Sequence, residues 1–194
     1  MSNMMLVKGD HDFLRRRFVR TVLTSEVKSG RKMIPISGNS PELDQELDSA
    51  LSMSSLFDQR LVLHITESEK VKDFSFTKWA SEDVLILFES KKQPKKLKLD
   101  KKFTKTFSSP PFFKLEEAAT DFFIEELKSR GCGIERKLAL FVVRAVGTDF
   151  GVLSFEALKA SCLTEGDVSV KVLKSSLAPL SEVAPLQIVK SLEN

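Results

Sequence analysis

The chain contains the uninterrupted apolar run Val84-Leu85-Ile86-Leu87-Phe88, and a second run of the same kind, Leu61-Val62-Leu63-His64-Ile65, precedes it. Short strands that are apolar on both faces are typical of a parallel sheet covered on both sides by other elements. We therefore expect residues 61–65 and 84–88 to form two buried strands of such a sheet.

Two further strands and a helix are predicted upstream of these runs. Met4-Met5-Leu6-Val7 ends at Gly9-Asp10 and predicts a first strand followed by a turn. Asp12 is expected to cap the next helix, and Gly30 to end it. The second strand is Met33-Ile34-Pro35-Ile36, and its proline favours a strand end or an edge position. The apolar stripe of the helix comprises Phe13, Leu14, Phe18, Val22 and Leu23.

A second helix and a helical connection complete the first half of the chain. Ser40 and Pro41 have the residue types of a cap and a first helical position. The apolar side chains Leu43, Leu47, Ala50 and Leu51 then recur at helical spacing. Between the two apolar runs, residues 67–83 are expected to contain one short helix. Because strands and helices alternate, we predict a three-layer α/β domain with a parallel sheet flanked by helices.

The pattern changes to helices after Pro110-Pro111, which predicts a domain boundary there. Helices are expected at 116–130, 138–146, 153–162 and 168–177, and a last one at 181–192. The third of them should bury Leu153, Ala157, Leu158 and Cys162. The sequence therefore predicts an α/β domain over residues 1–111 and a small all-helical domain over residues 112–178.

Composition excludes several classes of protein. The 194 residues include 30 Lys and Arg against 27 Asp and Glu, a net charge of +3, which is too small to indicate a nucleic-acid-binding protein by itself. Cys132 and Cys162 lack the spacing of a zinc or redox motif, and we interpret both as reduced, small core residues. No secretion signal and no membrane-spanning run is found, so a soluble, cytoplasmic protein is expected.

The turn after the first strand lacks the residues of a phosphate-binding loop. It reads Gly9-Asp10-His11-Asp12-Phe13-Leu14-Arg15-Arg16, with Leu14 in place of the second glycine and two arginines in place of Lys-Ser/Thr. Asp10 and Asp12 would repel a phosphate. His11 has no second strong metal ligand within reach, and His64 is expected to be a satisfied core histidine. No catalytic constellation is present, so we predict no cofactor, no metal and no enzymatic activity.

Leu56 and Phe57 lie where the second helix runs into the strand that begins at Leu61. Continuing the helix at about 100° per residue places Leu56 roughly opposite the Leu43/Leu47 stripe, with Phe57 near its edge. An exposed Leu-Phe pair would suit the apolar pocket of a partner protein. Alternatively, Ser54-Ser55 could unwind the helix so that the pair caps the core. Composition alone favours this second interpretation.

A lysine-rich segment follows the fourth strand. It carries Lys91, Lys92, Lys95, Lys96, Lys98, Lys101, Lys102 and Lys105. The segment has few stacking aromatic residues, so a solvated loop is favoured over a surface that follows a phosphate backbone. A DNA-binding module acting through Lys91–Lys105 is the alternative function.

Taken in order, these features resemble the delta subunits of bacterial DNA polymerase III, a clamp-loader family that opens the ring-shaped sliding clamp. The resemblance lies in the opening stretch 6–14, in the block Ser55-Leu56-Phe57-Asp58-Gln59-Arg60-Leu61-Val62-Leu63, and in the turn Val146-Gly147-Thr148-Asp149-Phe150 with the helix after it. It continues through residues 168–192. The similarity spans nearly the whole chain.

The resemblance implies an AAA+-like fold without a functional phosphate loop and a non-catalytic subunit of the polymerase holoenzyme. It also implies that Leu56 and Phe57 contact the sliding clamp, with Met53 at a position where the clamp-binding pattern has glutamine. The implied partners are the clamp, the gamma/tau and delta prime loader subunits, and primed DNA. Residues 179–194 would then begin a C-terminal collar that is otherwise missing from the sequence.

Overall fold

The computed structural model describes residues 3–57 and 59–176, with the backbone alone for residues 53–57, 174 and 176. The contacts divide the chain into two compact units, Met1–Ser109 and Pro110–Asn194. The first unit contains β1 (Met4–Lys8), α1 (Asp12–Lys28), β2 (Lys32–Ser37), α2 (Leu43–Phe57), β3 (Leu61–Thr66), the 3₁₀ turns η1 (Ser68–Lys70) and η2 (Ser75–Trp79), β4 (Val84–Ser90), η3 (Lys101–Phe103) and β5 (Thr104–Thr106).

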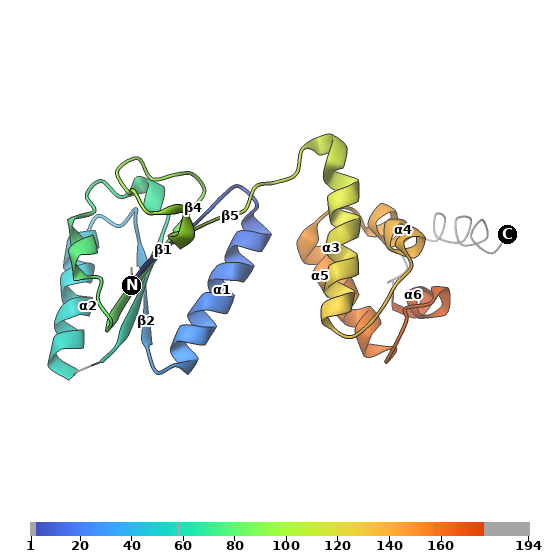
Figure 1. The fold of residues 1–194 in the computed structure, drawn as a ribbon, viewed down its shortest axis with the longest axis horizontal. Helices are drawn as coiled ribbons and strands as arrows, with labels where there is room; N and C mark the ends of the chain where they lie inside the picture. The colour runs from blue at the N-terminus through green and yellow to red at the C-terminus, as the bar shows by residue number, and fades with distance from the viewer. Residues whose placement is uncertain (1–2, 58, 177–194) are drawn as a thin grey trace. The chain divides into compact units, whose positions relative to one another are not determined.

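The five strands form one parallel sheet in the order β2-β3-β4-β1-β5. The two apolar runs lie next to each other in its interior as β3 and β4, with Leu63 opposite Ile86. Strand β2, which contains Pro35, lies at an edge, as its proline indicated. Helices α1 and α2 lie on opposite sides of the sheet (Figure 1). The predicted α/β fold with a parallel sheet flanked by helices is confirmed.

The core on the α2 side of the sheet is much larger than the core on the α1 side. Side chains alternate between the two faces of each strand. Of the described residues, thirteen buried apolar side chains form the cluster on the α2 side, including Leu47, Leu63 and Phe88. The cluster on the α1 side has four, Val7, Val19, Val62 and Leu87. Most of the hydrophobic stabilisation of this unit therefore comes from the α2 face.

Three local predictions in this unit are corrected. Residue His11, not Asp12, is the N-cap of α1, because its imidazole accepts a hydrogen bond from the Leu14 amide at 3.5 Å. Helix α2 begins at Leu43, although the Ser40 hydroxyl does accept a hydrogen bond from the Glu42 amide, two residues along. The connection between β3 and β4 forms two short 3₁₀ turns instead of one helix, with Phe76 buried in the α2-side core.

The second unit is all-helical, with η4 (Phe112–Lys114), α3 (Leu115–Ser129), α4 (Arg136–Val146), α5 (Phe150–Cys162) and α6 (Val170–Ser176). Helix α3 buries the predicted Ala119, Phe122, Phe123 and Leu127. Helix α5 differs from expectation: Leu158 is 41% exposed and Cys162 is exposed, because α5 turns Phe150, Leu153, Ala157 and Ala160 inward. The predicted segment 179–194 lies outside the described residues.

Candidate functional site

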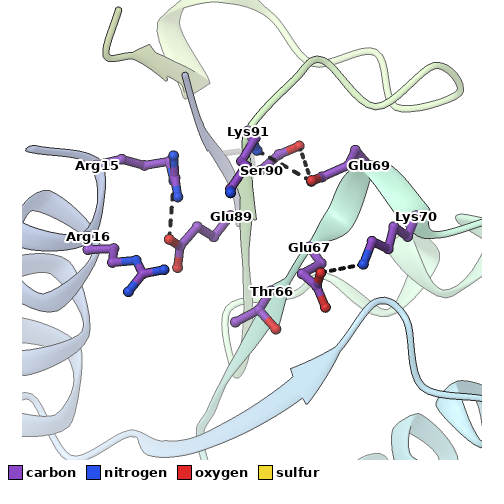
Figure 2. Close-up of a pocket in the computed structure, with 9 residues that line it drawn as sticks. All are labelled: Arg15, Arg16, Thr66, Glu67, Glu69, Lys70, Glu89, Ser90 and Lys91. Atoms are coloured by element: carbon purple, nitrogen blue, oxygen red, sulfur yellow. Dashed lines mark hydrogen bonds and ion pairs between the residues drawn. The ribbon is translucent and has the colours of Figure 1, made fainter. Parts of the chain in front are cut away.

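A cavity of about 520 Å³ opens at the carboxyl edge of the sheet, where β3 and β4 end. In open α/β sheets, ligands bind outside the carboxyl ends of the strands, at the point where the order of the strands in the sheet reverses. Figure 2 shows side chains from α1 and from the ends of β3 and β4 around the cavity. Charges of both signs line it: Arg15, Arg16, Thr66, Glu67, Glu69, Lys70, Glu89, Ser90 and Lys91.

Arg15 is buried at this edge and holds three elements together. It is 3% exposed, and its Nε lies 3.2 Å from Glu89 Oε1 at the end of β4. Its Nη2 lies 2.7 Å from Asp12 Oδ1, and its Nη1 donates to the carbonyl of Gly9. The other carboxylate oxygen of Glu89 lies 3.0 Å from His64 Nε2 on β3. We refer to Asp12, Arg15, His64 and Glu89 as the Arg15 network.

The network keeps its carboxylates ionised. Hydrogen bonding by His64 lowers the pKa of Glu89, and Arg15 adds to this effect, although burial opposes it. Burial also acts to raise the pKa of Asp12, but the hydrogen bond and charge of Arg15 and the nearby Lys91 and Arg16 outweigh it and lower that pKa. The charge of Arg15 is thus neutralised from within the protein, and the predicted core histidine His64 has its partner in Glu89.

The amides of the turn between β1 and α1 are used internally. The Gly9 amide donates to Ser90 O at 3.2 Å, and the His11 amide donates to Phe107 O at 3.2 Å. A phosphate-binding loop instead leaves successive amides free to surround the anion. Arg15, which the sequence placed where such a loop has lysine, points to Glu89 (Figure 2). It also donates to the Gly9 carbonyl. This geometry does not provide a phosphate cradle.

The far wall of the cavity consists of ion-paired and hydrogen-bonded groups. Lys70 pairs with Glu67 at 2.5 Å, and Glu69 accepts from the Ser90 hydroxyl at 2.7 Å. Among the described residues, no group of three or more His, Cys, Asp or Glu side chains is placed to hold a metal ion. Within the same residues, no helix is long and apolar enough to span a membrane. The absence of enzymatic activity stays a prediction.

No protein-family model matches the sequence, and no curated protein matches it. Among solved structures, the chain is similar to the DNA clamp loader delta protein YqeN of Bacillus subtilis, with a TM-score of 0.65 and 14% sequence identity. The match covers 91% of this chain and 58% of that one. The chain has a clamp-loader-like fold. A structure of PCH-2 from C. elegans matches with a TM-score of 0.46 and 11% identity over 100% of this chain and 62% of that one, too weak a likeness to support an argument.

The predicted clamp-binding residues lie at the opposite edge of the sheet from the cavity. The backbone of Met53, Leu56 and Phe57 belongs to the last turns of α2, which ends at Phe57 just before β3 begins at Leu61. The side chains of residues 53–57 lie outside what the structure describes, so it tests neither interpretation of the Leu-Phe pair.

Arg31, which the sequence analysis did not single out, fixes this edge of the sheet. Its guanidinium is buried and donates to the carbonyls of Leu61, Glu82 and Asp83 at 3.2, 2.6 and 2.8 Å. Its Nε lies 3.0 Å from Glu26 Oε2 on α1. These bonds tie the start of β2 to the starts of β3 and β4, next to the end of α2. An arginine directly after the helix-ending Gly30 was the available signal, but the carbonyls to which it donates are distant in sequence.

The predicted lysine surface is exposed at all five of its chosen positions, Lys91, Lys92, Lys95, Lys96 and Lys98. Two apolar residues of the same segment, Pro94 and Leu97, are buried, and Leu97 joins the core on the α2 side. Lys96 donates to the carbonyl of Lys72 at 2.8 Å. The segment is therefore attached to the sheet by its apolar residues and presents its lysines outward.

Proposed function

We propose that this protein is a delta-type subunit of a bacterial clamp loader, which binds the sliding clamp and opens its ring without hydrolysing ATP. The observation that carries the proposal is the likeness of the fold to the clamp loader delta protein of Bacillus subtilis. The Leu56-Phe57 pair at the end of α2 matches the clamp-contacting pair of the family that the sequence resembles. The self-neutralised Arg15 network supports a role in which other subunits supply ATP hydrolysis.

The mechanism follows from differential binding. Leu56 and Phe57 insert into an apolar groove of one clamp subunit, with Met53 packing alongside. The protein shifts the clamp towards an open ring only as far as it binds the open form more tightly than the closed one. The partners are the sliding clamp, the gamma/tau and delta prime subunits, and primed DNA. The proposed domains are residues 1–111, 112–178 and the beginning of a collar at 179–194.

Replacing Leu56 and Phe57 together with Ala is expected to weaken clamp binding by roughly 2 to 4 kcal/mol, because a few buried apolar anchors dominate such interfaces. The affinity of the full chain for a purified bacterial sliding clamp can be measured by surface plasmon resonance. The matched control is Phe112→Ala/Phe113→Ala, which removes another apolar pair that is 92% and 81% exposed. Equal clamp affinity for the Leu56/Phe57 variant and the unmodified chain would reject the proposal.

The exposed lysine surface supports one second candidate, a DNA-binding module that acts through Lys91–Lys105. This candidate predicts that log K for primed DNA falls by about 0.9 per phosphate contact for each tenfold rise in salt. Changing Lys91, Lys92, Lys95, Lys96 and Lys98 to Gln should flatten that slope, while Leu56→Ala/Phe57→Ala should leave it unchanged. Fluorescence anisotropy over a salt series measures both. A slope that the five substitutions do not alter excludes the lysine surface.

A further inference from the structure

The topology of the sheet leaves one of its faces incompletely covered. The connection from β1 to β2 crosses β4 and β3 in one direction, and every later connection steps in the opposite direction. Parallel crossovers are right-handed in nearly all cases, so α1 lies alone on one face and the connections after β2 lie on the other. The composition of the two cores supports this assignment of faces. Each of the three later connections contributes a residue to the α2-side cluster, namely Leu47, Phe76 and Leu97.

A single helix is too narrow for this face. Five strands about 4.8 Å apart span roughly 19 Å, whereas a helix with its side chains is about 10 Å across. Helix α1 and Phe107 pack on Val7, Val62 and Leu87 from β1, β3 and β4. On β2, at the edge of the sheet, the residues of this same face, Met33 and Pro35, are instead exposed and have no helix above them among the described residues of this unit.

A groove of about 640 Å³ occupies that place. One wall is the side of α1 that carries Val19, Leu23 and Val27, and the other side is formed by Met33 of β2 and His64 of β3. Val27 is 49% exposed and Met33 is 40% exposed, and because both line the same groove they form an exposed apolar patch. We call this the α1 groove.

The rim of the α1 groove is positively charged. Arg16, Arg20 and Lys28 line it along one side of α1, and all three are exposed. Among the described residues that line the groove, Glu89 is the acidic one. Its two carboxylate oxygens are already paired with Arg15 and His64. An apolar floor with a row of cations along one side is complementary to an amphipathic helix that has acidic residues beside its apolar stripe.

We propose that the α1 groove is a docking site for an amphipathic, acidic helix of a partner protein, lying alongside α1 over the β2 edge of the sheet. Lys28 lies twelve positions after Arg16, which is a length of about 18 Å along a helix. The partner segment is accordingly about three turns long. Its apolar side chains contact Met33, Val27 and Leu23, and its carboxylates pair with Arg20 and the neighbouring cations.

The test uses the full chain and two synthetic helical peptides of about fourteen residues. Both peptides carry leucines at i, i+3, i+4 and i+7; one has glutamates beside this stripe and the other has lysines. Fluorescence anisotropy is expected to show saturable binding of the acidic peptide, at least tenfold tighter than that of the basic one. Met33→Glu should abolish binding and Arg20→Glu should weaken it at least tenfold.

The matched control is Arg17→Glu, on the same helix but outside the residues that line the groove. It should change the affinity less than twofold, and circular dichroism shows whether each variant keeps its fold. Leu56→Ala/Phe57→Ala should bind the acidic peptide normally, so failure of the clamp proposal and failure of this one are distinguishable.

Three results would overturn the proposal. The first is equal binding of the acidic and basic peptides, or no saturable binding of either. The second is a concentration-dependent dimer that Met33→Glu dissolves, which would make a second copy of the chain the occupant. The third is a photo-crosslink from p-benzoylphenylalanine, introduced in place of Met33, to the protein's own chain, which would make the occupant intramolecular.

Discussion

Replacing Glu89 with Gln is expected to lower the free energy of unfolding of the first unit by about 3 kcal/mol. The substitution keeps the volume of the side chain but removes the negative charge that faces the buried guanidinium of Arg15. Asp12 and the Gly9 carbonyl remain, and neither replaces a charge-assisted bond to Arg15 Nε. Urea unfolding followed by the fluorescence of Trp79, the chain's one tryptophan, measures the loss within this unit.

The pH dependence of the same variant provides a second readout. The pKa of Glu89 lies below its ordinary value of 4.5 in the folded protein, mainly because of the hydrogen bond from His64. At acidic pH the unfolded chain therefore binds this proton more readily than the folded chain does. The stabilisation is complete above pH 4.5 and is lost as the pH falls through the lowered value. The stability difference between the unmodified chain and Glu89→Gln should accordingly shrink in acid.

Glu67→Gln is the matched control for Glu89→Gln. Glu67 lines the same cavity and also forms an ion pair, with Lys70, but both side chains of that pair are close to half exposed. Exposed ion pairs contribute little to stability because solvent screens them. The prediction would fail if the two substitutions lowered the stability equally.

Gly9→Ala is expected to destabilise the first unit by at least about 3 kcal/mol, because two independent penalties act at this position. Gly9 has a φ of +130°, a region that L side chains rarely adopt. A Cβ atom there would lie 1.8 Å from the carbonyl oxygen of Phe107 and 2.5 Å from its carbonyl carbon. Relieving this overlap would separate the turn after β1 from the end of β5. It would also break the hydrogen bond from the His11 amide to Phe107 O.

Gly30→Ala separates the two penalties. Gly30 has a φ of +91°, but no atom lies within 4 Å of the position of its Cβ. Gly30→Ala should therefore lower the free energy of unfolding only by the backbone penalty, about 1 kcal/mol. Both variants can be compared by urea unfolding monitored by Trp79. A Gly9→Ala variant that is no less stable than Gly30→Ala would contradict the predicted contact between the turn and Phe107.

Local pattern in the sequence was sufficient for the fold class of this protein. Apolar runs at 61–65 and 84–88 determined two interior parallel strands, because a strand buried on both faces has no polar alternation. Pro35 indicated the edge strand, since it has no backbone N–H to donate to a neighbouring strand. The glycines after α1 and α4 indicated helix ends, because Gly30 and Gly147 have positive φ values. Each of these signals acts over a few neighbouring residues.

The site depended on contacts between residues far apart in the sequence. The sequence placed Arg15 only where a phosphate-binding loop has lysine, and the packing of α1 against the end of β4 brought it to Glu89, 74 positions away. The carbonyls that accept from Arg31 were likewise remote, 30 to 52 positions along the chain. The uncovered β2 edge of the α1-side face followed from strand order and crossover handedness, which no local pattern encodes. The spacing of apolar residues along the sequence indicates which side chains are buried. The partner of a buried charge is determined only when distant segments pack together.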